Sequence, residues 1–178
     1  MIDTLISSKT RLKLLLKFFL NSNTTAYLRS LEEEFGESTN GIRLELNRFE
    51  DAGMLQSFSQ GNKKIFKANT KHPLFTDIHS IIVKFVGLDK IIESIIQRLG
   101  NIEYTYLRGT FARGIDGGEI DILLVGSVDM PFLEDLVQKA EKKINRKIVY
   151  EVVTFEQFTK SYTIQEKKEF LLLWEREK

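Results

Sequence analysis

The sequence contains no cysteine, only two prolines and one tryptophan, and its 178 residues carry a net charge of +1. The lack of cysteine excludes a disulfide framework and a thiolate metal site. A net charge so close to zero gives no global argument for nucleic-acid binding, so that argument must come from local patterns. No apolar run reaches the roughly 18 residues of a membrane-spanning helix, because Lys13 and Lys17 interrupt the most hydrophobic stretch. There is also no signal-peptide pattern, so we expect a soluble cytoplasmic protein with one large or two small domains.

The most informative stretch is residues 106–126, which read Y-L-R-G-T-F-A-R-G-I-D-G-G-E-I-D-I-L-L-V-G. Its second half is typical of a buried strand, yet Glu119 and Asp121 occupy positions where apolar residues are expected. Strand side chains alternate between faces, so the two carboxylates point the same way and together suit Mg²⁺. Upstream, Gly109 allows a close backbone approach to a ligand, and the turn it opens offers N–H groups to phosphate. The stretch predicts a phosphate site beside a metal site; the alternative is a solvated strand edge after an ordinary Gly-Thr turn.

These residues resemble the minimal nucleotidyltransferase domain of the DNA polymerase β superfamily, whose signature is G-[GS], a spacer, and D-x-[DE] on a strand. The resemblance implies that Gly109 and Thr110 hold the triphosphate of an NTP such as ATP, and that Glu119 and Asp121 bind Mg²⁺. Two residues depart from the signature. Thr110 replaces serine and keeps the hydroxyl, whereas Glu119 replaces the first aspartate and lengthens that ligand by one methylene. Mg²⁺ demands near-ideal octahedral geometry, so the second departure bears directly on catalysis.

The same family has a third carboxylate on a later strand, and the predicted strand 147–154 carries a single acid, Glu151. Glu151 is therefore our candidate for a further metal ligand and for the general base that accepts the proton of an attacking hydroxyl. Two alternatives stay open, since Tyr150 could occupy the matching position and Glu151 could face solvent. Arg108 or Arg113 would offset negative charge in the transition state of nucleotidyl transfer.

The N-terminal half predicts three helices followed by a β-hairpin, which is the layout of a winged helix-turn-helix. We expect Thr25 to cap the second helix and Gly36 to end it, with Ser38 or Thr39 capping the third. The predicted helices are 10–20, 26–35 and 39–52, and the predicted hairpin strands are 54–59 and 64–68.

The third helix would be the recognition helix, because its outward face carries side chains suited to base edges, and lysines on the hairpin are suited to phosphates. The candidate DNA-binding residues are Thr39, Asn40, Arg43, Asn47, Lys63 and Lys64. Leu44 on the same face is unsuited to a DNA groove and could mark a protein contact, as winged helices also serve as protein-interaction modules. Residues 46–75 resemble arsenic-repressor-like winged helices fused to nucleotidyltransferase domains. The uncharged stretch 56–60 predicts weaker DNA affinity than an arginine-rich wing would give.

Between the two halves, His72-Pro73 marks a hinge, and two isoleucine-rich helices are predicted at 73–86 and 88–99. Their apolar faces either pack the two halves together or form a homodimer interface. His79 has no second ligand-type neighbour and is expected to be structural or on the surface. Further helices are predicted at 131–143, 156–162 and 164–174.

The sequence as a whole predicts an α+β protein. Residues 1–72 would form the winged helix-turn-helix, 73–100 a helical connector, and 101–178 a small nucleotidyltransferase-like α/β domain with a mixed sheet. Three functions follow as hypotheses: a Mg²⁺-dependent nucleotidyltransferase, a DNA-binding transcriptional regulator whose rear domain only senses nucleotide, and an antitoxin-like partner of a helical toxin.

Overall fold

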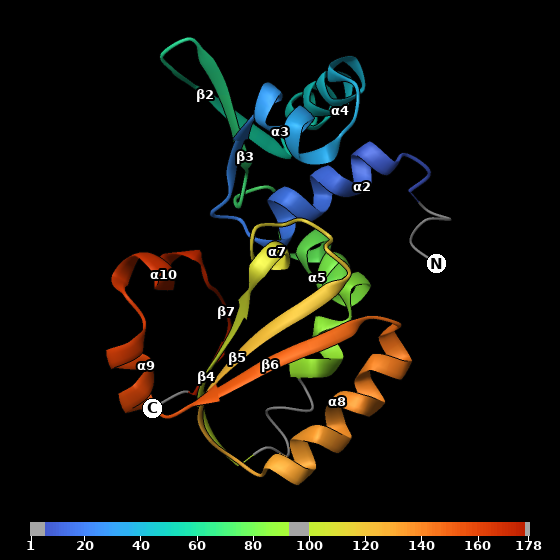
Figure 1. Ribbon diagram of the computed structural model, residues 1–178. Helices are drawn as coiled ribbons and strands as arrows, with labels where there is room; N and C mark the ends of the chain where they lie inside the picture. The colour runs from blue at the N-terminus through green and yellow to red at the C-terminus, as the bar shows by residue number, and fades with distance from the viewer. Residues whose placement is uncertain (1–5, 93–99, 177–178) are drawn as a thin grey trace. The chain divides into compact units, whose positions relative to one another are not determined.

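The computed structural model describes residues 6–92 and 100–176. The chain divides into two compact units, and the boundary along the sequence is between Phe85 and Val86. Unit 1 holds the helices and hairpin of the N-terminal half, and unit 2 holds a four-stranded sheet with its own helices (Figure 1). The predicted connector 73–100 is therefore shared between the two units.

Unit 1 begins with α2 (Lys9–Leu15), whose first turn is capped by the Ser8 hydroxyl accepting the Arg11 N–H at 3.2 Å. α2 continues directly into a π-helical turn, η1 (Leu16–Leu20), in which all five residues are buried. The predicted first helix is thus present, with its last turn widened to i→i+5 hydrogen bonding. Phe18 and Phe19 are the largest fully buried side chains of this segment and anchor the core of unit 1.

The second helix starts later than predicted, because residues 25–27 form strand β1 (Thr25–Tyr27) and pair with Lys67, Phe66 and Ile65. α3 (Leu28–Phe35) follows, and its N-terminus is satisfied by Ser30, whose hydroxyl accepts the Tyr27 N–H at 3.1 Å. The prediction that Thr25 caps this helix is wrong, because Thr25 is already part of a β-ladder. Gly36 ends the helix in the left-handed conformation, as expected.

The third helix, α4 (Thr39–Asp51), is capped by Ser38 and buries Ile42, Leu46 and Phe49, the face predicted from the sequence. The same helix buries Glu45, which binds Arg11 at 2.8 Å and Arg48 at 2.9 Å. A buried carboxylate is tolerated only when it is paired. Burial alone would raise the pKa of Glu45, but the hydrogen bonds from these arginines outweigh it and lower the pKa.

The predicted hairpin is formed by β2 (Leu55–Gln60) and β3 (Lys63–Ala68), and β1 joins β3 to complete an antiparallel sheet of order β1-β3-β2. α5 (Phe75–Val86) follows, and His79 Nδ1 lies 2.6 Å from the Phe19 carbonyl oxygen, so His79 fills the structural role expected for it.

The helix is interrupted by a turn at Gly87, and the chain is helical again over residues 88–92. The rest of the predicted helix 88–99, and with it much of the predicted dimer interface, lies outside the described residues. Within the described parts of the chain, no helix is long and apolar enough to cross a bilayer.

Unit 2 is built on a sheet of order β6-β5-β4-β7. β5 and β6 run parallel while the other neighbours are antiparallel, so the sheet is mixed, as predicted. The strands are β4 (Gly100–Arg108), β5 (Glu119–Val128), β6 (Lys147–Val153) and β7 (Leu171–Glu175).

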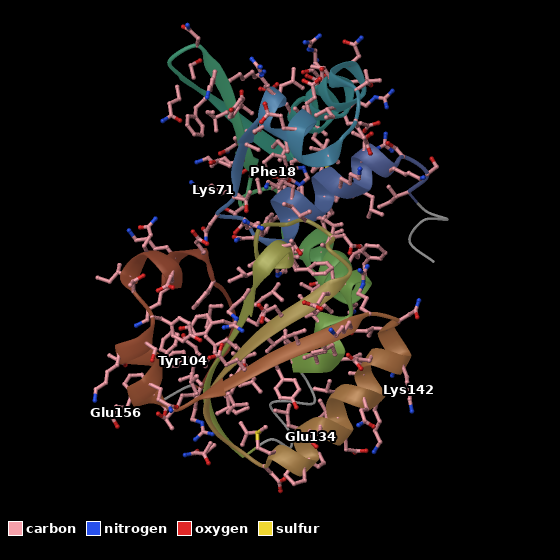
Figure 2. All side chains as sticks on the ribbon, viewed as in Figure 1. Phe18, Lys71, Tyr104, Glu134, Lys142 and Glu156 are labelled. Carbon is pink, nitrogen blue, oxygen red and sulfur yellow. The ribbon has the colours of Figure 1, made fainter. Side chains whose placement is uncertain are left out.

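The two faces of this sheet are covered by different helices. Side chains of α8 (Met130–Ile144) line a small cavity together with Ile122, Leu124 and Ile148, so α8 covers that face. On the opposite face, Phe158 of α9 (Phe155–Ser161) packs against Leu123. Tyr104 lies on this second face beside α9 (Figure 2), with its ring stacked on Phe155 at 6.3 Å between centroids.

The predicted helix 164–174 is wrong in its second half. α10 (Ile164–Glu169) ends at Phe170, whose backbone is extended, and the following residues form β7 instead. β7 pairs with β4, with Trp174 opposite Thr105, and so satisfies backbone groups of β4 that would otherwise form a sheet edge. The apolar run 170–174 is compatible with a helix or a strand. It forms a strand because β4 offers unpaired backbone groups along its edge.

The backbone around Gly126 leaves no room for a side chain, so a substitution there should destabilise unit 2. The φ of Gly126 is +145°, and a Cβ there would lie 2.8 Å from Ile102 Cα and closer still to the Asn101 carbonyl oxygen. Gly126→Ala should therefore lower the free energy of unfolding of unit 2 by about 2–4 kcal/mol. Gly118→Ala is the control, because Gly118 also has positive φ but open space around it, and should cost about 1 kcal/mol. Urea unfolding followed by Trp174 fluorescence measures both, and equal losses would contradict this account.

Candidate functional site

The turn after β4 lies against one of the predicted metal ligands. Gly109 adopts φ +66° directly after Arg108, and a Cβ at Gly109 would lie 3.7 Å from Asp121 Cβ. The helix it opens, α7 (Gly109–Ala112), is a single turn between β4 and β5 (Figure 1). The backbone bend and Asp121 are therefore neighbours, as the sequence predicted.

Thr110 points toward the loop that leads into β5. Its hydroxyl lies so close to Gly117 that any side chain at 117 would collide with it. The same loop is held by Arg146, which makes a bidentate pair with Asp116, with Nη2 at 2.7 Å from Oδ2. The Gly109-Thr110 bend is thus packed from both sides, by Asp121 and by a loop that is itself fixed to the start of β6.

The strand register places Glu151 and Tyr150 on opposite faces of the sheet. In the parallel pair β5–β6, Glu151 is opposite Leu123, whereas Tyr150 is opposite Ile122. Because side chains alternate, Glu151 is on the face of Asp121, and Tyr150 is on the face covered by α8. We call the side of the sheet that carries Glu119, Asp121 and Glu151 the acidic face.

Arg108 lies between two of these acids. Its Nε and Nη2 donate to Asp121 Oδ1 at 3.1 and 2.8 Å, and its Nη1 donates to Glu151 Oε2 at 2.5 Å. The Arg108 side chain is only 17% exposed. From the sequence we expected Arg108 at the nucleotide, where it would offset negative charge; in the structure it donates to Asp121, Glu151 and the Tyr162 hydroxyl.

The electrostatics of this cluster follow from the same contacts. Burial alone would lower the pKa of Arg108, but the hydrogen bonds to Asp121 and Glu151 outweigh it and raise the pKa. The hydrogen bond from Arg108 lowers the pKa of Glu151, partly opposed by burial and assisted by Tyr162. Burial and the Glu151 carboxylate together raise the pKa of Tyr162.

Tyr162 was missed by sequence analysis. It follows α9, and its hydroxyl lies 3.3 Å from Arg108 Nη1. No local pattern marks it, because it reaches the site only through the packing of its ring against Phe158 and Phe170.

The remaining predicted site residues of unit 2, Glu119 and Arg113, are exposed. Glu119 is on the acidic face, 49% exposed, with Oε2 at 3.4 Å from Lys147 Nζ. Arg113 is exposed and comes directly after α7. Among the residues the structure describes, no three acidic or histidine side chains converge closely enough to hold a metal ion.

The residues nevertheless fit a cation. Asp121 and Glu151 already share one, since the Arg108 guanidinium donates hydrogen bonds to both carboxylates. Carboxylate oxygens are the ligands that Mg²⁺ takes in proteins, commonly one or two of them with substrate phosphates. The chemistry of the pair therefore suits Mg²⁺, and Arg108 is the group that a metal would replace.

Unit 1 contains a second candidate site, a hollow of about 570 Å³ between α3, α4 and the hairpin. Five of the six predicted DNA-binding residues line it, namely Thr39, Arg43, Asn47, Lys63 and Lys64. The sixth, Asn40, accepts a hydrogen bond from Arg43 Nη1 at 3.4 Å. The two lysines differ, because Lys64 binds Glu50 at 2.6 Å while the Lys63 ammonium lies 4.1 Å from the centre of the Tyr27 ring.

The Arg108–Glu151 contact predicts how the stability of unit 2 depends on pH. A carboxyl whose pKa is lowered on folding stabilises the fold above its unfolded pKa and loses that contribution as the pH falls through the folded value. Arg108→Met should therefore destabilise unit 2 most near neutral pH, by on the order of 1 kcal/mol because Glu151 is half exposed. The difference from wild type should shrink below about pH 4.3.

Urea midpoints from Trp174 fluorescence across a pH series measure this dependence. Glu151→Gln is the matched variant, since it removes the titrating group and should flatten the same acid limb. Wild-type and Arg108→Met curves that stay parallel down to acid pH would contradict the assigned contact.

Comparison with known proteins gives limited guidance. No family model matches the chain, and no curated protein does. Among solved structures it is similar to a mutant of the toxin–antitoxin complex MntA–HpeT, with 20% identity over 51% of this chain and 73% of that one and a TM-score of 0.38. It is also similar to a putative nucleotidyltransferase from Sulfolobus solfataricus, with 26% identity over 54% of this chain and 85% of that one and a TM-score of 0.37. A protein from Shewanella oneidensis matches with 17% identity over 52% of this chain and 72% of that one, at a TM-score of 0.35. Likenesses at this level carry no argument about function, which has to come from the site itself.

Proposed function

We propose that unit 2 is a nucleotidyltransferase-type domain that moves a nucleoside monophosphate from an NTP such as ATP to an acceptor hydroxyl. One observation carries this proposal. Asp121 and Glu151, on neighbouring parallel strands, hold a cation between them, and the Gly109 bend packs directly against Asp121. A carboxylate pair beside a close-approach glycine provides the two parts that phosphoryl transfer needs, which are charge neutralisation and positioning.

Each residue has a role in this proposal. Gly109 and Thr110 bind the β- and γ-phosphates through backbone N–H groups and the hydroxyl. Glu119, Asp121 and Glu151 would hold Mg²⁺, which neutralises phosphate charge when bound. Glu151 is the third carboxylate and, once released from Arg108, also accepts a proton.

The transfer balances as a single displacement. The acceptor oxygen forms a bond to the α-phosphorus while the bond to pyrophosphate breaks, and Glu151 takes the proton from the acceptor hydroxyl. Arg108 and Arg113 offset the negative charge on the departing phosphates.

Asp121→Asn tests this proposal. The neutral side chain keeps the shape but removes one metal-binding charge, so Mg²⁺-dependent release of pyrophosphate from labelled NTP should fall by about 100-fold or more. Asp135→Asn is the matched control, an exposed aspartate on α8 paired with Lys139, and should leave turnover unchanged. Wild-type turnover that survives Asp121→Asn would exclude this site. Nucleotide binding without any turnover would instead favour a regulator that senses nucleotide.

We also propose that unit 1 is a winged helix-turn-helix that binds double-stranded DNA, with α4 as the recognition helix and β2–β3 as the wing. The hollow between α3, α4 and the hairpin supports this proposal, because it gathers Arg43 and Asn47 for base edges and Lys63 for phosphate. Lys64 is held by Glu50 and contributes less, as an ion-paired lysine has less charge to offer a phosphate.

A gel-shift on DNA upstream of the gene for this chain tests the second proposal. Arg43→Ala should weaken binding by about 1–3 kcal/mol, and Lys63→Ala should lower the salt dependence by roughly one unit of slope. Arg48→Ala is the control, because Arg48 is on the same helix but its guanidinium binds Glu45. Equal effects of Arg43→Ala and Arg48→Ala would count against a recognition face at this hollow.

Two protein partners belong to the same proposal. A second copy of the chain would pack on residues 73–99, whose described part exposes Leu74 and Ile81. A helical toxin-like protein would contact the outward face of α4, where Leu44 is 52% exposed. Light scattering measures the first association, and co-purification with the product of an adjacent gene measures the second.

A further inference from the structure

The acidic face of unit 2 already contains a cation, and this cation is part of the chain. This further inference rests on the nucleotidyltransferase proposal above and concerns the regulation of the same site. We propose that Arg108 is the resident counter-ion of Asp121 and Glu151, and that it keeps divalent metal out of the pair until nucleotide phosphates draw the guanidinium away.

The contacts of Arg108 use the geometry of a guanidinium fully. Nε and Nη2 converge on one oxygen of Asp121 at 3.1 and 2.8 Å, while Nη1 turns to Glu151 at 2.5 Å. Charge-assisted bonds of this kind are stronger than neutral ones, and the fork of donors fixes the side chain between β5 and β6. One oxygen of each carboxylate, Asp121 Oδ1 and Glu151 Oε2, is therefore already bound to the guanidinium.

A metal ion and the guanidinium cannot both occupy this position. Two positive charges within a few ångströms of each other repel strongly at a site where Arg108 is only 17% exposed and solvent screening is weak. A metal ion bound to this pair would also draw its ligands from the same two carboxylates. The two cations therefore compete for one position, and the tethered one is present at a much higher effective concentration.

A nucleotide would supply what Arg108 needs in order to leave. Arg108 directly precedes Gly109, so phosphates bound at the bend would be within reach of its guanidinium. A phosphate accepts the same bidentate bonds as a carboxylate. The Glu151 side chain is 46% exposed, so the outer arm of the guanidinium borders solvent and can exchange partners without a rearrangement of the core.

The consequence is a coupling between two ligands. Metal alone should bind wild-type protein weakly, and nucleotide should strengthen metal binding because it removes the competitor. This arrangement prevents a metal from being held at the site without substrate. A purely structural role, in which Arg108 only ties β4 to β5 and β6, would produce no such coupling.

Mn²⁺ binding measured by electron paramagnetic resonance, without nucleotide, separates the two roles. Arg108→Met keeps the length of the side chain but removes the charge, and should bind Mn²⁺ about tenfold more tightly than wild type. The double variant Arg108→Met with Asp121→Asn should lose that gain, which locates the new affinity at the pair. Arg146→Met is the matched control, because Arg146 also makes a bidentate carboxylate pair and is 16% exposed, yet its partner is Asp116.

A second measurement uses wild-type protein, so the inference remains testable if Arg108→Met does not fold. Mn²⁺ affinity of wild type should rise by about tenfold or more when a non-hydrolysable NTP analogue is added together with the metal, above the affinity of the analogue alone for Mn²⁺.

The outcomes distinguish this inference from the proposed function. Wild type that binds Mn²⁺ as tightly as Arg108→Met in the absence of nucleotide, and whose Mn²⁺ affinity does not rise when nucleotide is added, would overturn the role of Arg108 and leave the metal site standing. Wild type that turns over NTP with Mg²⁺, while neither protein shows the predicted gain in Mn²⁺ affinity, would also overturn it. A complete absence of metal binding, nucleotide binding and turnover in both proteins would remove the proposed function as well.

Discussion

One guanidinium joins three strands of the second unit's sheet, since Arg108 at the end of β4 binds Asp121 on β5 and Glu151 on β6. Two carboxylates on adjacent strands repel each other, and a cation bonded to both offsets that repulsion. Asp121 also packs against the Gly109 bend, so the ion pair that positions Asp121 helps to position the bend. Tyr162, which follows α9, adds a fourth segment to this network through its hydroxyl, 3.3 Å from Arg108 Nη1. The same ion pairs therefore connect the strands of unit 2 to its candidate chemistry.

In each unit a poorly exposed charged side chain is paired with two side chains of opposite charge. In unit 1, Glu45 on α4 is buried and held by Arg11 and Arg48. In unit 2, the pairing is reversed, with one arginine shared by two acids. Sharing leaves the acidic face with one more negative charge than positive charge at its centre, before the exposed Glu119–Lys147 contact is considered. A surplus of negative charge is what attracts a divalent cation, whereas the Glu45 site, with two arginines for one acid, carries a positive surplus and offers a divalent cation nothing.

The sequence predicted elements well where local signals agree. The Ser38 cap and the apolar spacing of Ile42, Leu46 and Phe49 are sufficient to define α4. Strand β5 is equally clear, because its apolar run is bounded by glycines. Short strands are different, since β1 and β7 form only where a partner strand offers free backbone groups, and periodicity does not record that partner. For the site, alternation placed Glu119 and Asp121 on one face, but only the β5–β6 register could choose Glu151 over Tyr150. The partners of Arg108 were not predictable, because they depend on three strands meeting in one register.

The central claim is that Asp121 and Glu151 form a cation position where a nucleotide's phosphates and a metal meet. The most direct measurement is a crystal structure with Mn²⁺ and a non-hydrolysable NTP analogue, with the metal located by its anomalous scattering. The account predicts a manganese peak between the two carboxylates, phosphates at the Gly109 bend, and the Arg108 guanidinium moved from the carboxylates onto a phosphate. A nucleotide bound elsewhere, or Arg108 still paired with both acids while manganese lies at another site, would contradict it.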